Sequence, residues 1–386
     1  MQLDTNHIVQ RFLRYVAIDT TSSEEIAVTE GQLRLANELA DELRQLGCSD
    51  VISTPHGYVY ASLPNNSQDN NLPAIGFIAH IDTSPDASGS NIKPIITKGS
   101  GPYEGQDIIT TDGTTLLGAD DKAGVTAIVS TAEYFITHPQ VSHGDLYFAF
   151  TPNEEVGRGT EHFDRDIFKA DFAYTIDGGT IGELEYENFN AASATVHFNG
   201  KNTHPGYAKG QMINAALLMS SFINQLPSDQ TPAYTEGRQG FYHVTSASAN
   251  TESADLKIII RDFDKQELQR RISFLIHLAN DMNKQFNCVS QPLVSVSHKF
   301  QYGNMFDVMK NHIDVIIRAR EAMRRLSIEP IERPIRGGTD GAMLTLFGLP
   351  CPNLFAGGEN FHSRDEFLPI PSLLAATQLI IEIAKT

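Results

Sequence analysis

Short apolar runs alternate with helix-forming segments through the first half of the chain, and this alternation limits the possible folds more than any other feature. Residues 74–79 form a continuous apolar run typical of a buried parallel strand, and strands are also predicted at 145–150 and 172–176. Helices are predicted at 30–46 and 121–136. Strands that alternate with helices predict an α/β fold with a mostly parallel sheet and helices on both faces.

The pattern changes near residue 186 and returns to α/β after about residue 296. Between these points we expect two helix–strand pairs in a compact α+β module: strands at 191–199, 241–248 and 254–262, and helices at about 211–225 and 264–284. The later part predicts helices at about 305–326, 339–347 and 371–385, and a strand at 352–355. The sequence therefore predicts a discontinuous large domain, 1–186 and 296–386, interrupted by a smaller domain, 187–295.

Composition agrees with a two-domain globular protein in a reducing compartment. The 386 residues exceed one ordinary core, and 41% are hydrophobic and 20% charged. No apolar run is long enough to cross a bilayer, and the N-terminus does not predict a signal peptide. The three cysteines, at positions 48, 288 and 351, are far apart, which argues against disulfides and a thiolate zinc site. We therefore expect a cytoplasmic protein with no membrane contact and with buried, inert cysteines.

The charge balance is strongly acidic. The chain has 29 basic and 47 acidic residues, a formal net charge of −18, and no block of Lys and Arg. Nucleic acid is therefore not expected as a partner. Part of the excess is expected on a solvated surface, and part in carboxylates that need a metal ion to lie close together.

Acids and histidines gather where predicted strands and turns end. Each group has an ordinary interpretation: His80 and Asp82 as a hydrogen-bonded pair, or Asp120 and Asp121 as a helix cap. Taken together, they are predicted to reach one edge of the sheet, where open α/β sheets bind ligands. The set consists of His80, Asp82, Asp120, Asp121, Glu154, Glu155, Asp177 and His362.

The ligand types indicate a catalytic metal site. Imidazole and carboxylate groups without thiolate suit zinc, cobalt or manganese. Several carboxylates packed together would repel one another, and two divalent cations would remove most of that penalty. The sequence thus predicts metal-assisted hydrolysis.

Longer strings resemble a known family. GFIAHIDTSPD, LLGADDKAG, FAFTPNEEVGRG, TIDGGTIGELEYENFNAA, HPGYAKG, TEGRQGFYH, IIRDFD, PIRGGTDGA and GLPCPNLFAGG span almost the whole chain. They are similar to the co-catalytic zinc exopeptidases that include carboxypeptidase G and aminoacylase, and within them to the tripeptide aminopeptidases. The resemblance implies a phosphorylase/hydrolase-like α/β/α catalytic domain with an inserted ferredoxin-like lid or dimerisation domain. It also implies two Zn²⁺ ions per subunit, replaceable by Co²⁺ or Mn²⁺, a short peptide substrate and a homodimer through the inserted domain.

The resemblance also implies residue roles. Asp120, two residues before the motif lysine, would bridge both metals, with His80 and Asp177 completing one site and Glu155 and His362 the other. Glu154 would be the general base for the water between the metals. Asp82 would hydrogen-bond His80 from behind and fix its tautomer.

Further residues are candidates for transition-state and substrate contacts. The resemblance implies that His204 stabilises the oxyanion, although a surface-loop histidine is the ordinary alternative. Asn214, Arg261 and Arg336 are candidate contacts for the substrate carboxylate or the backbone near it, and structural ion pairs are the alternative for the arginines. Asp340 either meets the free α-amino group or caps the following helix.

Other functions remain to be distinguished. A related dipeptidase, carboxypeptidase or amino-acid deacylase would use the same metals. A non-catalytic scaffold is disfavoured because Glu154 and every ligand are present, and a nucleophilic hydrolase because the chain has no GxSxG motif. Two features depart from the family pattern: a short connection at 83–117, and Ser363 in place of the glycine that usually follows the last ligand histidine.

Overall fold

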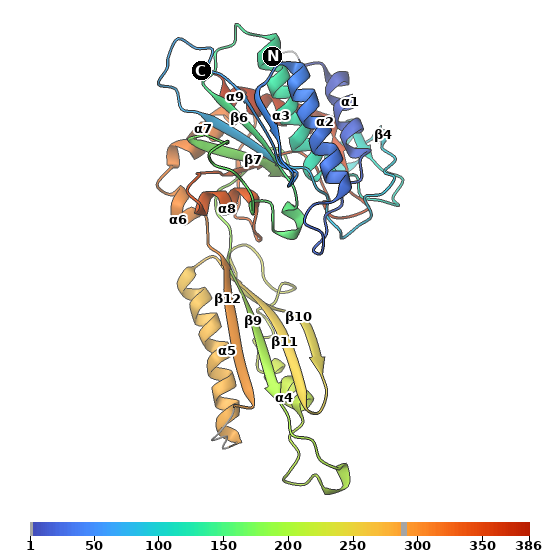
Figure 1. The fold of residues 1–386 in the computed structure, drawn as a ribbon, viewed down its shortest axis with the longest axis vertical. Coiled ribbons are helices and arrows are strands. Elements are labelled where there is room, and N and C mark those ends of the chain that lie inside the picture. The colour runs from blue at the N-terminus through green and yellow to red at the C-terminus, as the bar shows by residue number, and fades with distance from the viewer. Residues whose placement is uncertain (1–2, 287–291) are drawn as a thin grey trace. The chain divides into compact units, whose positions relative to one another are not determined.

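The computed structural model describes residues 3–286 and 292–386, which form two compact units (Figure 1). The larger unit comprises Met1–Glu187, Met305–Arg333 and Thr339–Thr386. The smaller unit comprises Asn188–Asn304 and Pro334–Gly338. The smaller unit is thus an insertion in the chain of the larger one.

An eight-stranded mixed sheet forms the centre of the larger unit. Its order is β1 (Ser49–Ser53), β2 (Val59–Leu63), β6 (Leu146–Thr151), β3 (Ile75–His80), β7 (Phe172–Gly178), β14 (Asn353–Phe355), β8 (Glu183–Glu185) and β13 (Ile331–Glu332). The four strands from β6 to β14 pair in parallel, whereas β1, β2 and β8 introduce antiparallel neighbours. The predicted mostly parallel α/β sheet is therefore confirmed at its centre.

Helices cover both faces of this sheet. One face packs against α1 (Thr5–Val16), α2 (Glu30–Leu46), α3 (Ala119–Thr137), α7 (Ile313–Arg325) and α9 (Ile370–Ala384) in one apolar core. On the other face, α8 (Asp340–Leu346) and the loop residue Phe168 form a second cluster. Helix α3 is buried along most of its length, and Gly124 makes this possible, because a Cβ there would lie 2.0 Å from the Ile176 carbonyl oxygen of β7. A small sheet of β15 (Leu368–Pro369), β5 (Asp107–Thr110) and β4 (Ile95–Lys98) completes the unit.

The smaller unit has the ferredoxin-like arrangement of two βαβ halves. Its antiparallel sheet has the order β10 (Phe241–Ala249), β11 (Ser253–Asp262), β9 (Asn190–Asn199) and β12 (Val294–Tyr302). Alternate residues of β9 and β11 are buried against α4 (Ala215–Ile223) and α5 (Lys265–Gln285). The period-2 pattern in the sequence therefore marks the face that the helices cover.

The structure corrects three expectations. The smaller unit extends past residue 295, because β12 pairs along its length with β9, and it also takes residues 334–338. The helix expected at 305–326 is interrupted: α6 (Phe306–Met309) ends before α7, and His312 between them has non-helical dihedral angles. Cys351 is buried as expected, Cys48 is half-buried, and Cys288 lies outside the described residues. None of the described helices is long and apolar enough to span a membrane.

Candidate metal centre

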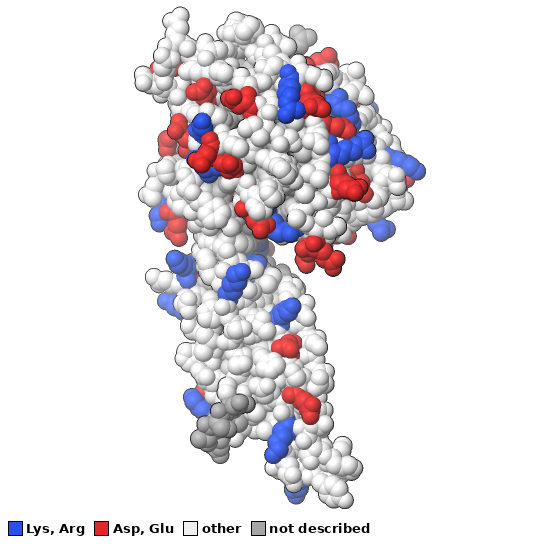
Figure 2. Space-filling view, in the orientation of Figure 1, with Lys and Arg blue, Asp and Glu red and all other residues white. Residues whose placement is uncertain are grey.

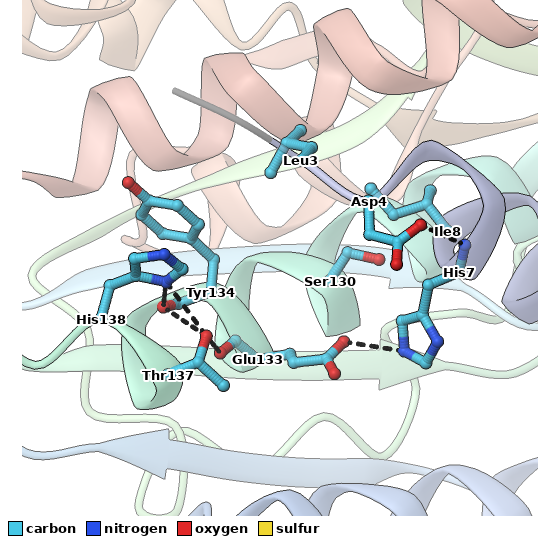
Figure 3. Close-up of a pocket in the computed structure, with 9 residues that line it drawn as sticks. All are labelled: Leu3, Asp4, His7, Ile8, Ser130, Glu133, Tyr134, Thr137 and His138. Atoms are coloured by element: carbon cyan, nitrogen blue, oxygen red, sulfur yellow. Dashed lines mark hydrogen bonds and ion pairs between the residues drawn. The ribbon is translucent and has the colours of Figure 1, made fainter.

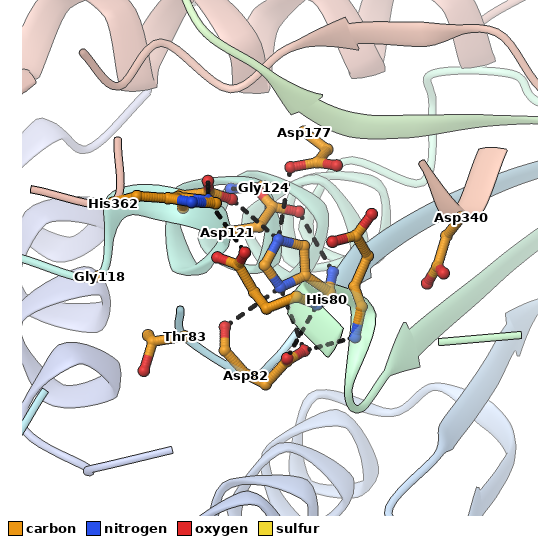
Figure 4. A network of polar contacts seen from close by, with 12 residues as sticks. His80, Asp82, Thr83, Gly118, Asp121, Gly124, Asp177, Asp340 and His362 are labelled. Carbon is orange, nitrogen blue, oxygen red and sulfur yellow. Dashed lines mark hydrogen bonds and ion pairs between the residues drawn. The ribbon is translucent and has the colours of Figure 1, made fainter. Parts of the chain in front are cut away.

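The predicted metal ligands meet at the carboxyl edge of the central strands. β3 ends at His80, and Asp177 lies near the end of β7, its parallel neighbour. β6, on the other side of β3, runs into the short 3-10 helix η2 (Glu154–Val156). Asp120 enters at the start of α3, and His362 enters from the loop after β14. Figure 4 shows His80 at the centre of the resulting polar network.

Asp120 lies between the two histidines. Its Oδ1 is 2.8 Å from Nε2 of His80, and its Oδ2 is 3.3 Å from Nε2 of His362. The remaining acids are divided between the histidines: Oδ1 of Asp177 lies 3.4 Å from His80 Nε2, and Oε2 of Glu155 lies 2.9 Å from His362 Nε2. The centre thus has two halves that share one carboxylate, as a bridged pair of ions requires.

The donor atoms fit divalent cations. Ligand atoms of His80, Asp120 and Glu155 lie within 4.8 Å of one another. Oε1 of Glu155 is buried and has no hydrogen-bond partner in the described part of the chain, so it is free to bind a cation. Oxygen and imidazole donors suit zinc, cobalt or manganese.

Asp121 forms a second geometric group with His80 and Asp177, but its oxygens already have partners. Oδ2 accepts the backbone N–H of His80 at 3.2 Å, and Oδ1 accepts that of Gly124 at 3.1 Å. Asp121 therefore supports the start of α3, and Asp120 is the better bridging ligand.

The electrostatics of the centre favour bound protons or cations. Burial raises the pKa of Asp177 to about 7. Burial alone would also raise the pKa of Asp120, but hydrogen bonds with His362 and His80 hold it below its usual value. Hydrogen bonds with Asp120 and Glu155 raise the pKa of His362 to about 11. The metal-free centre therefore retains protons that divalent cations would displace.

Asp82 organises both a ligand and the candidate base. Its buried carboxylate accepts the backbone N–H of Glu154 at 3.0 Å and that of Glu155 at 3.2 Å. Nδ1 of His80 lies 3.1 Å from the backbone carbonyl oxygen of Asp82 and 3.3 Å from Oδ1 of the Asp82 side chain. The carboxylate of Glu154 makes no hydrogen bond with the described residues, and burial, with the charge of Asp177, raises its pKa well above the usual value. Among the described residues, Glu154 therefore has no hydrogen-bond partner that would compete with its predicted role as a base.

Comparison with known proteins identifies the family. The family model described as "Peptidase family M20/M25/M40" matches residues 76–386. The chain belongs to this peptidase family. Peptidase T of Clostridium perfringens (strain 13 / Type A) is 48% identical over 400 residues, covering 97% of this chain and 98% of the relative. Peptidase T of Clostridium botulinum (strain 657 / Type Ba4) is 46% identical over 407 residues, covering 98% of each chain.

Solved structures show the same fold. Aminopeptidase PepT from Bacillus cereus matches with a TM-score of 0.82 at 22% identity, covering 99% of this chain and 98% of that one. A tripeptidase from Staphylococcus aureus also has a TM-score of 0.82 at 22% identity, covering 100% of this chain and 98% of that one. The α/β unit with a small antiparallel-sheet unit is thus the M20 peptidase fold.

Arg336 has a structural role within the smaller unit of this M20 peptidase. Its guanidinium donates to the carbonyl oxygens of Thr235, Gly237 and Gln239 and to the Thr235 hydroxyl, at 2.7–3.2 Å. It also stacks over the rings of Phe189 and Phe241. These contacts occupy both terminal nitrogens and clamp the 235–239 loop, so they favour a structural role for Arg336 over the predicted substrate contact.

The other three candidates in the smaller unit keep unused polar groups. Oδ1 of Asn214 caps α4 by accepting from Ala216 and Leu217. Arg261 stacks over Tyr302, and among the described residues only its Nη1 makes hydrogen bonds. Nδ1 of exposed His204 accepts the backbone N–H of Gly206 at 3.1 Å, so the neutral ring carries its proton on Nε2. That tautomer can donate to an oxyanion.

Asp340 does not cap α8, because Thr339 accepts the backbone N–H of Ala342 in that role. Asp340 is instead buried, and its Oδ2 accepts the Thr151 hydroxyl at 2.7 Å. Burial raises its pKa to about 6. Figure 4 places Asp340 beside the polar network, which leaves the α-amino contact as its remaining predicted role.

Two acidic residues near His362 were not predicted to have a role. Oδ2 of Asp86 lies 3.4 Å from Nδ1 of His362, so both ligand histidines have a carboxylate behind them. Glu366 is buried and accepts backbone N–H groups from the start of α3. Both stand in strings next to predicted ligands, but spacing alone does not reveal such contacts. Ser363 holds the loop by donating to the Asn360 carbonyl oxygen at 2.7 Å.

A separate hollow lies between α1 and α3 and is lined by Leu3, Asp4, His7, Ile8, Ser130, Glu133, Tyr134, Thr137 and His138 (Figure 3). Several of its polar groups pair with one another: Nε2 of His7 lies 3.2 Å from Glu133, and Thr137 contacts His138 at 3.1 Å. The hollow therefore does not compete with the metal centre as the functional site.

Proposed function

We propose that this chain is an aminopeptidase that removes the N-terminal residue from tripeptides with two zinc ions per subunit. The observation that carries the proposal is the position of Asp120 between His80 and His362, with Glu154 free beside them. The names of the peptidase T relatives and of the tripeptidase structure support the substrate class.

The bound ions would be held by His80, Asp120, Glu155, Asp177 and His362. Two such ions supply Lewis-acid polarisation of a carbonyl and a lowered pKa for water. Cobalt and manganese accept the same donor types and are expected to substitute for zinc.

The protein groups would move the proton. Glu154 would take a proton from the attacking water and deliver it to the leaving amine. Asp82 holds the backbone of Glu154 and the Nδ1 side of His80, so that the base and a ligand keep their relative positions.

Substrate recognition is assigned to groups that still have unused donors or acceptors. Asp340 would bind the free α-amino group, and Arg261 with Asn214 the peptide carboxylate or the backbone near it. His204 would stabilise the oxyanion through Nε2–H. A homodimer through the smaller unit is a further part of this proposal.

Charge and cysteine content support a proposal for the partners and the cellular location of the enzyme. On the face drawn in Figure 2, basic side chains are mixed with acidic ones and do not form a stripe, in line with a small peptide rather than nucleic acid as the partner. The sparse cysteines support a cytoplasmic location, and the absence of membrane contact is a further part of the proposal.

The decisive experiment is hydrolysis of a panel of di-, tri- and tetrapeptides and acylated amino acids by metal-stripped and zinc-restored protein. Tripeptides should lose their first residue only after zinc is restored. Preferred cleavage of dipeptides, C-terminal residues or acyl groups would favour the dipeptidase, carboxypeptidase or deacylase alternative. Full activity after complete metal removal would contradict every two-metal mechanism.

A further inference from the structure

Glu366 contacts the segment that carries the bridging ligand from a position far along the chain. Its Oε2 accepts the backbone N–H of Leu117 at 2.7 Å and that of Gly118 at 2.8 Å. Its Oε1 accepts the N–H of Asp120 at 3.0 Å. The side chain is 1% exposed, so these bonds are shielded from water.

The backbone of this segment is shaped to receive an anion. Gly118 has a φ of +79°, a left-handed conformation that lets neighbouring N–H groups point to one side. Helix α3 begins at Ala119, and its preceding residue provides no side-chain cap. Asp120 and Asp121 have non-helical dihedral angles, and Asp121 caps the regular part of α3 by accepting the N–H of Gly124. Glu366 therefore holds the turn that precedes the regular helix and that carries Asp120.

Glu366 also belongs to the loop that carries the ligand His362. It follows His362 by four residues, and His362 is held at a φ of +60°, which is uncommon for a residue with a side chain. One carboxylate thus ties the loop of His362 to the backbone of Asp120. By contrast, His80 pairs with Thr151 across β3 and β6, and Asp177 lies within β7, so the central sheet supports both.

We propose that Glu366 is a positioning residue that sets Asp120 relative to His362 and so determines the affinity of the metal site formed by Glu155, His362 and Asp120. The inference rests on the proposed two-metal function. Glu366 should affect the affinities of the two sites unequally. The site that contains His80 and Asp177 should depend on Glu366 less than the other site, because the central sheet supports both of these ligands.

The test compares Glu366→Gln and Glu366→Asp with the unchanged protein. Glutamine has one acceptor oxygen and cannot accept from both sides of the segment, and aspartate keeps the charge but is one methylene shorter. Glu382→Gln is the matched control, because Glu382 is also buried, at 4% exposure, but pairs with Arg325 and Lys385 at the end of α9. The two Zn²⁺ dissociation constants are measured by competition with a chromophoric chelator, and the Co²⁺ absorption spectrum reports ligand geometry.

One of the two Zn²⁺ affinities should fall about 10–100-fold in both Glu366 variants, the magnitude usual for outer-shell partners of ligands. The other affinity should change by less than threefold, and the Co²⁺ spectrum should change for only one of the two bound equivalents. Glu382→Gln should leave both constants unchanged.

Unchanged constants in the Glu366 variants, or equal losses at both sites, would overturn the inference. If Glu366→Gln does not fold, Glu366→Asp decides by the same criterion. Failure of the unchanged protein to bind two Zn²⁺ ions would instead refute the proposed function, so the two failures can be told apart.

Discussion

Asp82 accepts the backbone N–H of Glu154 at 3.0 Å, so the acid behind the ligand His80 also holds the candidate base. This contact joins two motifs that are 72 residues apart in the sequence. The sequence predicted only the half of this role that concerns His80. Asp82 is therefore expected to affect metal binding and proton transfer together.

Replacing Asp82 with Asn should weaken both functions. The amide nitrogen would face a backbone N–H of Glu154 or Glu155, where the carboxylate now accepts. We expect a loss of about 10–100-fold in zinc affinity and a further fall in kcat at saturating zinc. Asp262→Asn, at a buried aspartate of the smaller unit that accepts from Asp264, serves as the control. A variant with normal kcat at saturating zinc would show that Asp82 does not position the base.

Replacing Glu154 with Gln should separate catalysis from metal binding. Glutamine cannot accept the proton, so kcat should fall by about 10²–10⁴-fold, while the zinc content stays unchanged. Glu155→Gln should instead lower the zinc content, because Oε2 of Glu155 faces His362. Steady-state kinetics with metal analysis checks both, with exposed Glu161→Gln as the control. Retention of more than a tenth of kcat in Glu154→Gln would exclude Glu154 as the base.

Metal binding should release protons and strengthen as the pH rises. Hydrogen bonds with Asp120 and Glu155 raise the pKa of His362 to about 11, so its ring is protonated near neutral pH in the metal-free protein. A cation must displace this proton, and zinc affinity should therefore increase from pH 6 to pH 8. Calorimetric titration in buffers of different ionisation enthalpy measures the released protons. An enthalpy independent of the buffer would contradict this linkage.

His204→Ala should lower kcat far more than metal content. The bond from Gly206 to Nδ1 leaves the proton on Nε2, which suits a donor to an oxyanion. Removal of one such donor typically costs about 10²–10³-fold in kcat. The exposed His56, in the larger unit, provides a matched His→Ala control. An unchanged kcat would make His204 an ordinary surface-loop residue.

Glu185 should make the metal-free protein less stable as the pH rises. Burial raises its pKa to about 7, so the folded state holds the proton more tightly than the unfolded chain. The stabilisation is complete below the unfolded pKa of about 4.5 and is lost as the pH rises through about 7. Its partial exposure reduces the effect to about 2 kcal/mol.

Glu185→Gln removes this titration and can keep the bond from Asn353 through its own oxygen. Urea unfolding at pH 5 and pH 8 should therefore show a smaller loss of stability in the variant than in the unchanged protein. Equal losses would mean that Glu185 is solvated in the folded state.

Local patterning in the sequence determined which elements form and where the ligands stand along the chain. The helix predicted at residues 30–46 is α2, and the apolar run at 74–79 is β3 shifted by one residue. Ligands at strand ends could be placed at one edge because parallel strands share a direction. The break at His312 and the strand β12 were not predicted, because neither leaves a strong local pattern.

Only the tertiary structure decided which side chains contact backbone groups that lie far away in the sequence. The sequence placed Asp82 beside His80, but only folding brings Asp82 to the backbone of Glu154, and Glu366 to that of Asp120. In the folded protein, Arg336 also donates hydrogen bonds to backbone carbonyl groups, and Thr339 rather than Asp340 caps α8. Local periodicity is set by neighbours along the chain, so it specifies elements and their order. Contacts between side chains and distant backbone depend on how the elements pack, and they become visible only in the folded molecule.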